Sequence, residues 1–187
     1  MTQSRTSKIM NKNKRLRELI AKGAVIMPGV PNAAMARQAE RAGFDAVYVS
    51  GAGMANATAG LPDIGLLTLS EVAQLAGYIA KAIDIPAIVD ADTGFGGAEN
   101  AARTIRELEG AGLAGCHIED QEFPKRCGHL AGKSLVDLEE MVGKIKAAVA
   151  SRRDPPEGGL PRPAMTNGCW GIAAWYREAR SSEYRHP

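Results

Sequence analysis

Three carboxylates carry one of the two strongest chemical signals in this sequence. Asp90 and Asp92 stand two residues apart, and Glu119 follows further along the chain. Mg²⁺ in proteins is held by a few carboxylates, with waters and substrate oxygens completing its octahedron. The set is therefore suited to a hard divalent cation that holds an α-hydroxy or α-keto acid. Taken alone it is a weak signal, because Asp90 capping a helix and Glu119 pairing with an arginine would give the same pattern.

The second signal is the sequence Lys125-Arg126-Cys127-Gly128-His129. Two cations and a nearby imidazole surround the Cys127 thiol with positive charge, which eases proton transfer by a thiol. Gly128 allows the backbone to approach a ligand closely. A nucleophilic role for Cys127, an acid–base role and an incidental surface loop are all open at this point.

Strands alternating with helices are the elements that must position these groups. Short β-branched runs predict strands, and longer stretches with helical periodicity predict helices between them. Thr68 and Glu71 have the spacing of a capping box at the start of one helix. The predicted strands are 24–27, 46–50, 85–90 and 115–119, and the predicted helices are a solvated opening helix within 1–22, then 32–42, 69–82, 98–110 and 137–151. This order predicts a parallel sheet built from four βα units.

Polar residues follow three of the predicted strands. Ser50, the pair Asp90 and Asp92, and the pair His117 and Glu119 all stand at carboxyl ends. Ligands bind at this edge of parallel α/β sheets, whether the sheet is open or closed into a barrel. A loop-capping role would explain any one of these groups, but three at one edge favour a ligand site.

Composition restricts the class of protein. The chain has 187 residues, 45% hydrophobic and 24% charged, which is typical of a globular domain. A formal net charge of +2 is too balanced to indicate a nucleic-acid partner. No run has the roughly 18 apolar residues of a membrane span, so no membrane association is expected. Cys116, Cys127 and Cys169 form no CxxC pair, which argues against a disulfide framework or structural zinc and favours a cytoplasmic protein.

Taken together, the motifs resemble the isocitrate lyase and phosphoenolpyruvate mutase superfamily, in particular its 2-methylisocitrate lyase branch. The matching segments, which occur in family order between about residues 10 and 154, are 48–53, 60–65, 89–96, 117–121 and 125–129. The loop around Cys127 is the signature of the lyase branch, since mutase-type members differ there. The resemblance implies an α/β fold of the (β/α)8 TIM-barrel family, of which this chain would form the N-terminal half.

The resemblance also implies a role for each site residue. Cys127 is implied to be the general acid, on a mobile loop that closes over the substrate and excludes water. The residues implied to bind the substrate are Ser50, Gly51, Ala52, Lys125, Arg126, Gly128 and His129. The residues implied to surround Mg²⁺, or Mn²⁺ in its place, directly or through water, are Asp63, Asp90, Asp92 and Glu119.

The implied reaction is a retro-aldol-type cleavage of a carbon–carbon bond in 2-methylisocitrate or a related 2-hydroxy di- or tricarboxylate. Mg²⁺ would polarise the half that becomes pyruvate, and Cys127 would protonate the carbon of the half that leaves as succinate. Isocitrate, methylisocitrate and dimethylmalate are alternative substrates, because a hydrophobic pocket discriminates one methyl group by only about 1 to 3 kcal/mol. The family forms homotetramers, so oligomerisation is also implied.

The resemblance ends near Asp154. Residues 155–187 hold five of the ten prolines and both tryptophans, with only Leu160 and Ile172 from the Leu/Ile/Val set. We therefore divide the chain into a half-barrel domain, 1–154, and an unassigned tail, 155–187, which we expect to be aberrant or disordered.

Half a barrel exposes two unpaired strand edges, so we expect little lyase activity from this polypeptide alone. A non-catalytic fragment that binds Mg²⁺ or a dicarboxylate weakly, or that associates with intact subunits, is one alternative function. A relative that acts on phosphonates or oxaloacetate is another, although the Cys127 loop argues against it.

Overall fold

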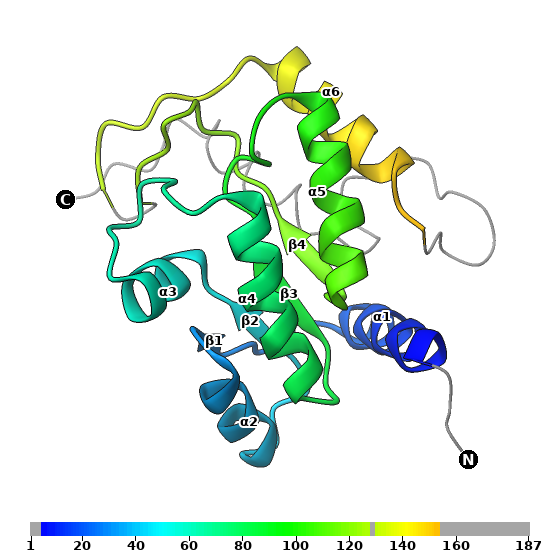
Figure 1. Ribbon diagram of the computed structural model, residues 1–187. Coiled ribbons are helices and arrows are strands. Elements are labelled where there is room, and N and C mark those ends of the chain that lie inside the picture. The colour runs from blue at the N-terminus through cyan, green and yellow to red at the C-terminus, as the bar shows by residue number, and fades with distance from the viewer. Residues whose placement is uncertain (1–4, 128–129, 154–187) are drawn as a thin grey trace.

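A computed structural model of the chain describes residues 5–127 and 130–153 (Figure 1). One parallel sheet, with strands in the order β1-β2-β3-β4, lies at its centre. The strands are β1 (Gly29–Val30), β2 (Val47–Val49), β3 (Ala87–Asp90) and β4 (Gly115–His117). Because all strands are parallel and follow chain order, their carboxyl ends meet at one edge of the sheet. The predicted α/β class with four parallel strands is confirmed; the predicted tail, 155–187, lies outside the described residues.

Helices precede, separate and follow the strands. They are α1 (Arg5–Lys22), α2 (Ala33–Arg41), α3 (Gly51–Met54), the π-helix η1 (Ala55–Ala59), α4 (Leu69–Ala82), α5 (Ala98–Ala111) and α6 (Leu138–Ala150). In the sheet, α2 contacts β1, α4 contacts β3 and α5 contacts β4, while α6 packs against α5. Among the described residues, no helix combines the length and the apolar character that crossing a membrane requires.

The two faces of the sheet differ in burial. Since side chains alternate along a strand, every second residue faces the covering helices. The buried residues of the covered face are Val47, Val49, Ala87, Val89 and Cys116. The partly exposed residues of the opposite face are Tyr48, Ile88, Asp90 and His117. The polar strand residues therefore share the face that α2, α4 and α5 leave uncovered.

The opening helix is present, but it is not the solvated helix that the sequence predicted. Leu16 is fully buried and packs near Gly115 of β4. Lys12 is also buried, and its Nζ donates hydrogen bonds of 2.7 Å to the carbonyls of Ala80 and Ile83 at the end of α4. The α1 helix thus contributes to the core and caps the carboxyl end of α4, because its charged and apolar residues find tertiary partners.

The first strand was predicted wrongly at 24–27. Pairing with β2 begins only where the Tyr48 N–H donates to the Pro28 carbonyl at 3.1 Å, so β1 is Gly29–Val30. Ile26 is 77% exposed, which shows that the preceding apolar run lies outside the core.

The segment 51–59 was not predicted to be helical, because its glycines are poor helix formers; Ser50 Oγ caps it by accepting from the Gly53 N–H at 3.0 Å.

The predicted helix 69–82 and its capping box are both confirmed. The Thr68 N–H donates to Glu71 Oε2 at 2.7 Å, and Thr68 Oγ1 accepts from the Glu71 N–H at 3.3 Å. Thr68→Ala should therefore lower the free energy of unfolding by about 1 kcal/mol. Urea denaturation measures this loss, with the exposed neighbour variant Ser70→Ala as the control. Equal stability of the two variants would contradict a capping role for Thr68.

Candidate active site

The predicted carboxylates do meet at the carboxyl edge of the sheet. Asp90 ends β3 in register with His117 of β4. Past the strand ends, the Glu119 N–H donates to the Asp92 carbonyl at 2.7 Å, and the Asp92 N–H donates to Asp90 Oδ1 at 3.1 Å. Asp92 has a φ of 46°, which a residue other than glycine rarely adopts. Such backbone conformations concentrate at functional sites, where surrounding contacts hold them.

Lys125 brings a positive charge into this group from the loop after β4. Its side chain is 2% exposed, and Nζ lies 2.6 Å from Asp63 Oδ1 and 2.7 Å from Asp92 Oδ1. Burial lowers the pKa of Lys125, but the hydrogen bonds to Asp63 and Asp92 outweigh burial and raise the pKa above its ordinary value. Lys125 is therefore an ammonium ion that joins the loop carrying Cys127 to two of the predicted metal-binding residues.

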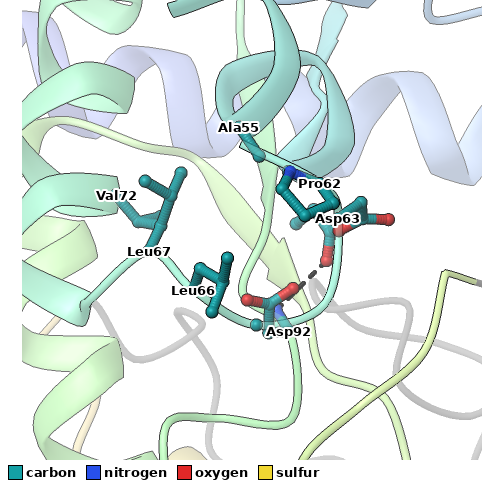
Figure 2. A pocket seen from close by; sticks show the side chains of 10 residues that line it. Ala55, Pro62, Asp63, Leu66, Leu67, Val72 and Asp92 are labelled. Atoms are coloured by element: carbon teal, nitrogen blue, oxygen red, sulfur yellow. Dashed lines mark hydrogen bonds between the residues drawn. The ribbon is translucent and has the colours of Figure 1, made fainter. Parts of the chain in front are cut away.

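A pocket lies beside this ion pair (Figure 2). Figure 2 shows Leu66, Leu67 and Val72 along one side, while Asp63 and Asp92 face them from the other. The lining residues are Gly51, Ala55, Pro62, Asp63, Gly65, Leu66, Leu67, Val72, Asp90 and Asp92. The cavity between the apolar wall and the carboxylates has a volume of about 10 Å³, which is room for about one water molecule.

The predicted carboxylate-binding residues Ser50, Gly51 and Ala52 lie next to Asp90. A Cβ placed on Gly51 would meet Asp90 Oδ2 at 2.8 Å, a distance too short for two such atoms. Glycine at this position therefore allows the turn after β2 to approach the acid at the end of β3. The Ser50 hydroxyl already caps α3, so it has a defined orientation at this edge.

Burial and mutual repulsion raise the pKa values of two acids in the group. For Glu119, burial followed by the charge of Asp90 raises the pKa to about 7. For Asp92, burial raises the pKa even though Lys125 donates a hydrogen bond to it. The edge of the sheet thus holds more negative charge than Lys125 neutralises, which is a setting that favours binding of a cation.

Two residues of the site were not among the predicted ones. Tyr48 Oη lies 3.2 Å from His117 Nδ1 on the uncovered face of the sheet. Burial raises the pKa of Tyr48 and lowers that of His117, so both are neutral at pH 7. Gln121, 5% exposed, contacts both Glu119 and Arg126. The signal available in the sequence was spacing, since Tyr48 stands two residues before Ser50 and Gln121 two residues after Glu119.

The loop of residues 125–129, which we call the thiol loop, is only partly brought to the carboxylates. Cys127 is partly exposed at the end of the described segment, whereas Cys116 is buried in β4 and burial raises its pKa. Arg126 is exposed and its Nη1 lies 3.5 Å from the Ala131 carbonyl, so the structure does not bring it to the carboxylates. Gly128 and His129, also predicted to bind substrate, and Cys169 lie outside the described residues.

The donor set decides which metal the site suits. Within residues 5–127 and 130–153, no three His, Cys, Asp or Glu side chains lie close enough together to form a metal cage. Mg²⁺ does not need one, because one or two carboxylates with several waters hold it. Asp90, at the strand end between Gly51 and Asp92, together with the excess negative charge, fits a hydrated Mg²⁺ of this kind.

Protonation of Glu119 should make stability depend on pH. Its pKa is about 7 in the folded chain against an ordinary value of 4.5, so between these values the folded state binds more protons than the unfolded state. The free energy of unfolding therefore falls as pH rises, by about 1–2 kcal/mol between pH 5 and pH 8. Urea denaturation at both pH values should show this slope in the chain and in the exposed-site control Glu122→Gln. The slope should shrink in Glu119→Gln, and an unchanged slope in that variant would refute the assignment.

Comparison with known proteins shows what this arrangement is similar to. The family model described as phosphoenolpyruvate phosphomutase matches residues 16–157. A 2-methylisocitrate lyase from Aeropyrum pernix is 57% identical over 140 residues, which cover 74% of this chain and 45% of the relative. A 2,3-dimethylmalate lyase from Eubacterium barkeri is 50% identical over 147 residues, covering 78% of this chain and 51% of the relative. The chain thus spans about half the length of these relatives.

Solved structures agree with the sequence comparison. Oxaloacetate acetylhydrolase in complex with 3,3-difluorooxalacetate matches with a TM-score of 0.73 and 38% identity, over 77% of this chain and 50% of that chain. 2,3-Dimethylmalate lyase matches with a TM-score of 0.71 and 43% identity, over 76% and 48%. Phosphonopyruvate hydrolase in complex with oxalate and Mg²⁺ matches with a TM-score of 0.68 and 36% identity, over 76% and 49%. The matches cover about half of each barrel chain, in line with the predicted half barrel.

Proposed function

Because this chain belongs to the phosphoenolpyruvate mutase/isocitrate lyase superfamily, we propose that its site serves a Mg²⁺-dependent carbon–carbon lyase that converts 2-methylisocitrate to pyruvate and succinate. The observation that carries the proposal is the ion pairing of Lys125 with Asp63 and Asp92. Lys125 stands two residues before Cys127, so these contacts hold the thiol loop at the carboxylate edge of the sheet.

In this proposal the substrate is bound by the turn after β2 and through the metal. Ser50, Gly51 and Ala52 receive a carboxylate at the turn after β2, directly beside Asp90. Asp90 would hold the metal, and Asp63, Asp92 and Glu119 would surround it, directly or through water. Mg²⁺, when bound, supplies Lewis-acid polarisation of the substrate's hydroxyl and carboxylate oxygens.

Cys127 acts as the general acid. As the substrate hydroxyl gives up its proton to a base or to solvent, the hydroxyl carbon becomes the carbonyl of pyruvate. The electron pair of the broken carbon–carbon bond is left on the carbon of the succinate half. The Cys127 thiol donates its proton to that carbon, which completes the new C–H bond. Lys125 keeps the loop over the site and so excludes water that would otherwise compete for this step. Arg126, Gly128 and His129 orient the substrate from the same loop.

The thiol loop favours a lyase over the related hydrolases. Protonation of a carbanion requires an acid next to carbon, and in this proposal Cys127, two residues after Lys125, is that acid. The curated relatives at 57% and 50% identity are both lyases, while the oxaloacetate acetylhydrolase and phosphonopyruvate hydrolase structures are further matches to the same fold. Small carboxylates are the ligands in two of those structures, which supports a di- or tricarboxylate as the partner.

The test is the product formed by the purified full chain, checked for monodispersity, with Mg²⁺ and with EDTA. We expect calorimetric binding of Mg²⁺ that EDTA reverses, and Mg²⁺-dependent pyruvate release from 2-methylisocitrate in any preparation that turns over, although a half barrel alone should turn over little. Parallel assays with isocitrate, 2,3-dimethylmalate, oxaloacetate and phosphonopyruvate define the specificity. Release of phosphate from phosphonopyruvate would reassign the chemistry, and a folded sample that binds neither Mg²⁺ nor 2-methylisocitrate would refute the proposed site.

A further inference from the structure

Gln121 makes an unusual set of contacts at the start of the thiol loop. Its side chain is buried, and Nε2 donates to Glu119 Oε2 at 2.5 Å and to the Arg126 carbonyl at 3.0 Å. Its Oε1 accepts from the Arg126 N–H at 3.0 Å. The Gln121 carboxamide therefore links Glu119, one of the predicted metal-binding residues, to both the N–H and the carbonyl of Arg126.

These contacts determine where the chain goes after Arg126. The Arg126 N–H belongs to the peptide unit shared with Lys125, and its carbonyl belongs to the peptide unit shared with Cys127. Holding both groups fixes two successive peptide planes, one on the side of the buried lysine and one on the side of the thiol. The Lys125 ion pairs alone would anchor only the first of these.

We propose that Gln121 is a positioning residue, whose carboxamide holds the Cys127 loop at a set distance from Glu119. The effect of Gln121 on catalysis rests on the proposed lyase function. The clamp, by which we mean the three hydrogen bonds of the Gln121 carboxamide, does not. Among side chains of this length only an amide offers two N–H donors and an acceptor together. Glutamate would lose the donor that both Glu119 and the Arg126 carbonyl use, and methionine would lose every contact.

The first test measures the loop without any substrate. Gln121→Met and Gln121→Glu are compared with the unmodified full chain and with Gln74→Met, which removes a 2.8 Å hydrogen bond to Tyr78 at an exposed site. The readouts are tryptic cleavage after Lys125 and Arg126, and alkylation of Cys127 by iodoacetamide, both mapped by mass spectrometry. Both rates should rise about tenfold in the Gln121 variants, because local opening precedes both reactions.

The second test is kinetic. In a preparation that turns over 2-methylisocitrate, both Gln121 variants should lose about 10- to 100-fold in kcat, while KM changes less, as expected when a group that orients a reacting residue is removed. Gln74→Met should retain the kcat of the unmodified chain. A general loss of folding would instead appear in the circular dichroism signal and in tryptic cleavage throughout the chain.

The outcomes separate the two proposals. Enhanced loop cleavage in the Gln121 variants of a folded chain that binds neither Mg²⁺ nor 2-methylisocitrate would refute the lyase function and support the clamp. Unchanged cleavage and alkylation in a folded Gln121→Glu variant would overturn the clamp, even if Gln121→Met does not fold. A loosened loop with unchanged kcat in an active preparation would overturn the positioning role.

Discussion

Cys127→Ser should lower kcat for cleavage of 2-methylisocitrate by about 10²- to 10⁴-fold, the usual contribution of a positioned general acid. A serine hydroxyl has nearly the same shape as the thiol but gives up a proton to carbon far less readily. In the proposed site, the contacts to the substrate carboxylate and to the metal would come from other elements, namely the turn after β2 and the ends of β3 and β4. Calorimetric binding of substrate and Mg²⁺ should therefore stay within a few-fold of the unmodified chain.

The control for this variant is Cys116→Ala, which changes the buried thiol of β4. It should retain kcat and lose some stability, because Cys116 is fully buried in the core. Unchanged turnover in Cys127→Ser would contradict the assignment of Cys127 as the acid. A substrate-derived mass addition on Cys127 would instead indicate a nucleophile, which was one of the roles that the sequence left open.

Lys125→Met should have the largest effect on stability, a loss of about 3 kcal/mol in the free energy of unfolding. The substitution leaves Asp63 and Asp92, which are 12% and 14% exposed, without the cation that bonds both. The remaining carboxylates then repel one another, and Glu119 and Asp92 already have raised pKa values. Because protonation removes that repulsion, the loss should be greatest at high pH and should shrink as the pH falls.

Urea denaturation at pH 5 and pH 8 measures this effect, with the exposed-site variant Lys146→Met as the control. Adding Asp63→Asn to Lys125→Met should restore part of the lost stability, because the effects of two substitutions within one ion-pair network on the free energy of unfolding are not additive. Mg²⁺ should stabilise Lys125→Met more than the unmodified chain, because a second cation can then approach Asp63 and Asp92. Equal stability of Lys125→Met and Lys146→Met would show that the buried ion pairs contribute nothing.

The order of βα units was determined by the sequence itself. The helix Leu69–Ala82 and its Thr68–Glu71 capping box were predicted to the residue, because a capping box joins groups only three positions apart. The meeting of Asp90, Asp92 and Glu119 was predicted for a similar reason. Parallel strands in chain order must end at one edge, so residues that directly follow strands become neighbours.

Only the tertiary structure decided the partners of the loop and of the first helix. The bond between Lys125 and Asp63 joins residues 62 positions apart, and Lys12 reaches the Ala80 carbonyl across 68 positions. Sequence periodicity predicts only contacts between residues a few positions apart. The contacts of Lys125 and Lys12 form because packing brings residues that are distant in the sequence together in the interior, where each buried charge and each buried backbone group needs a hydrogen-bond partner.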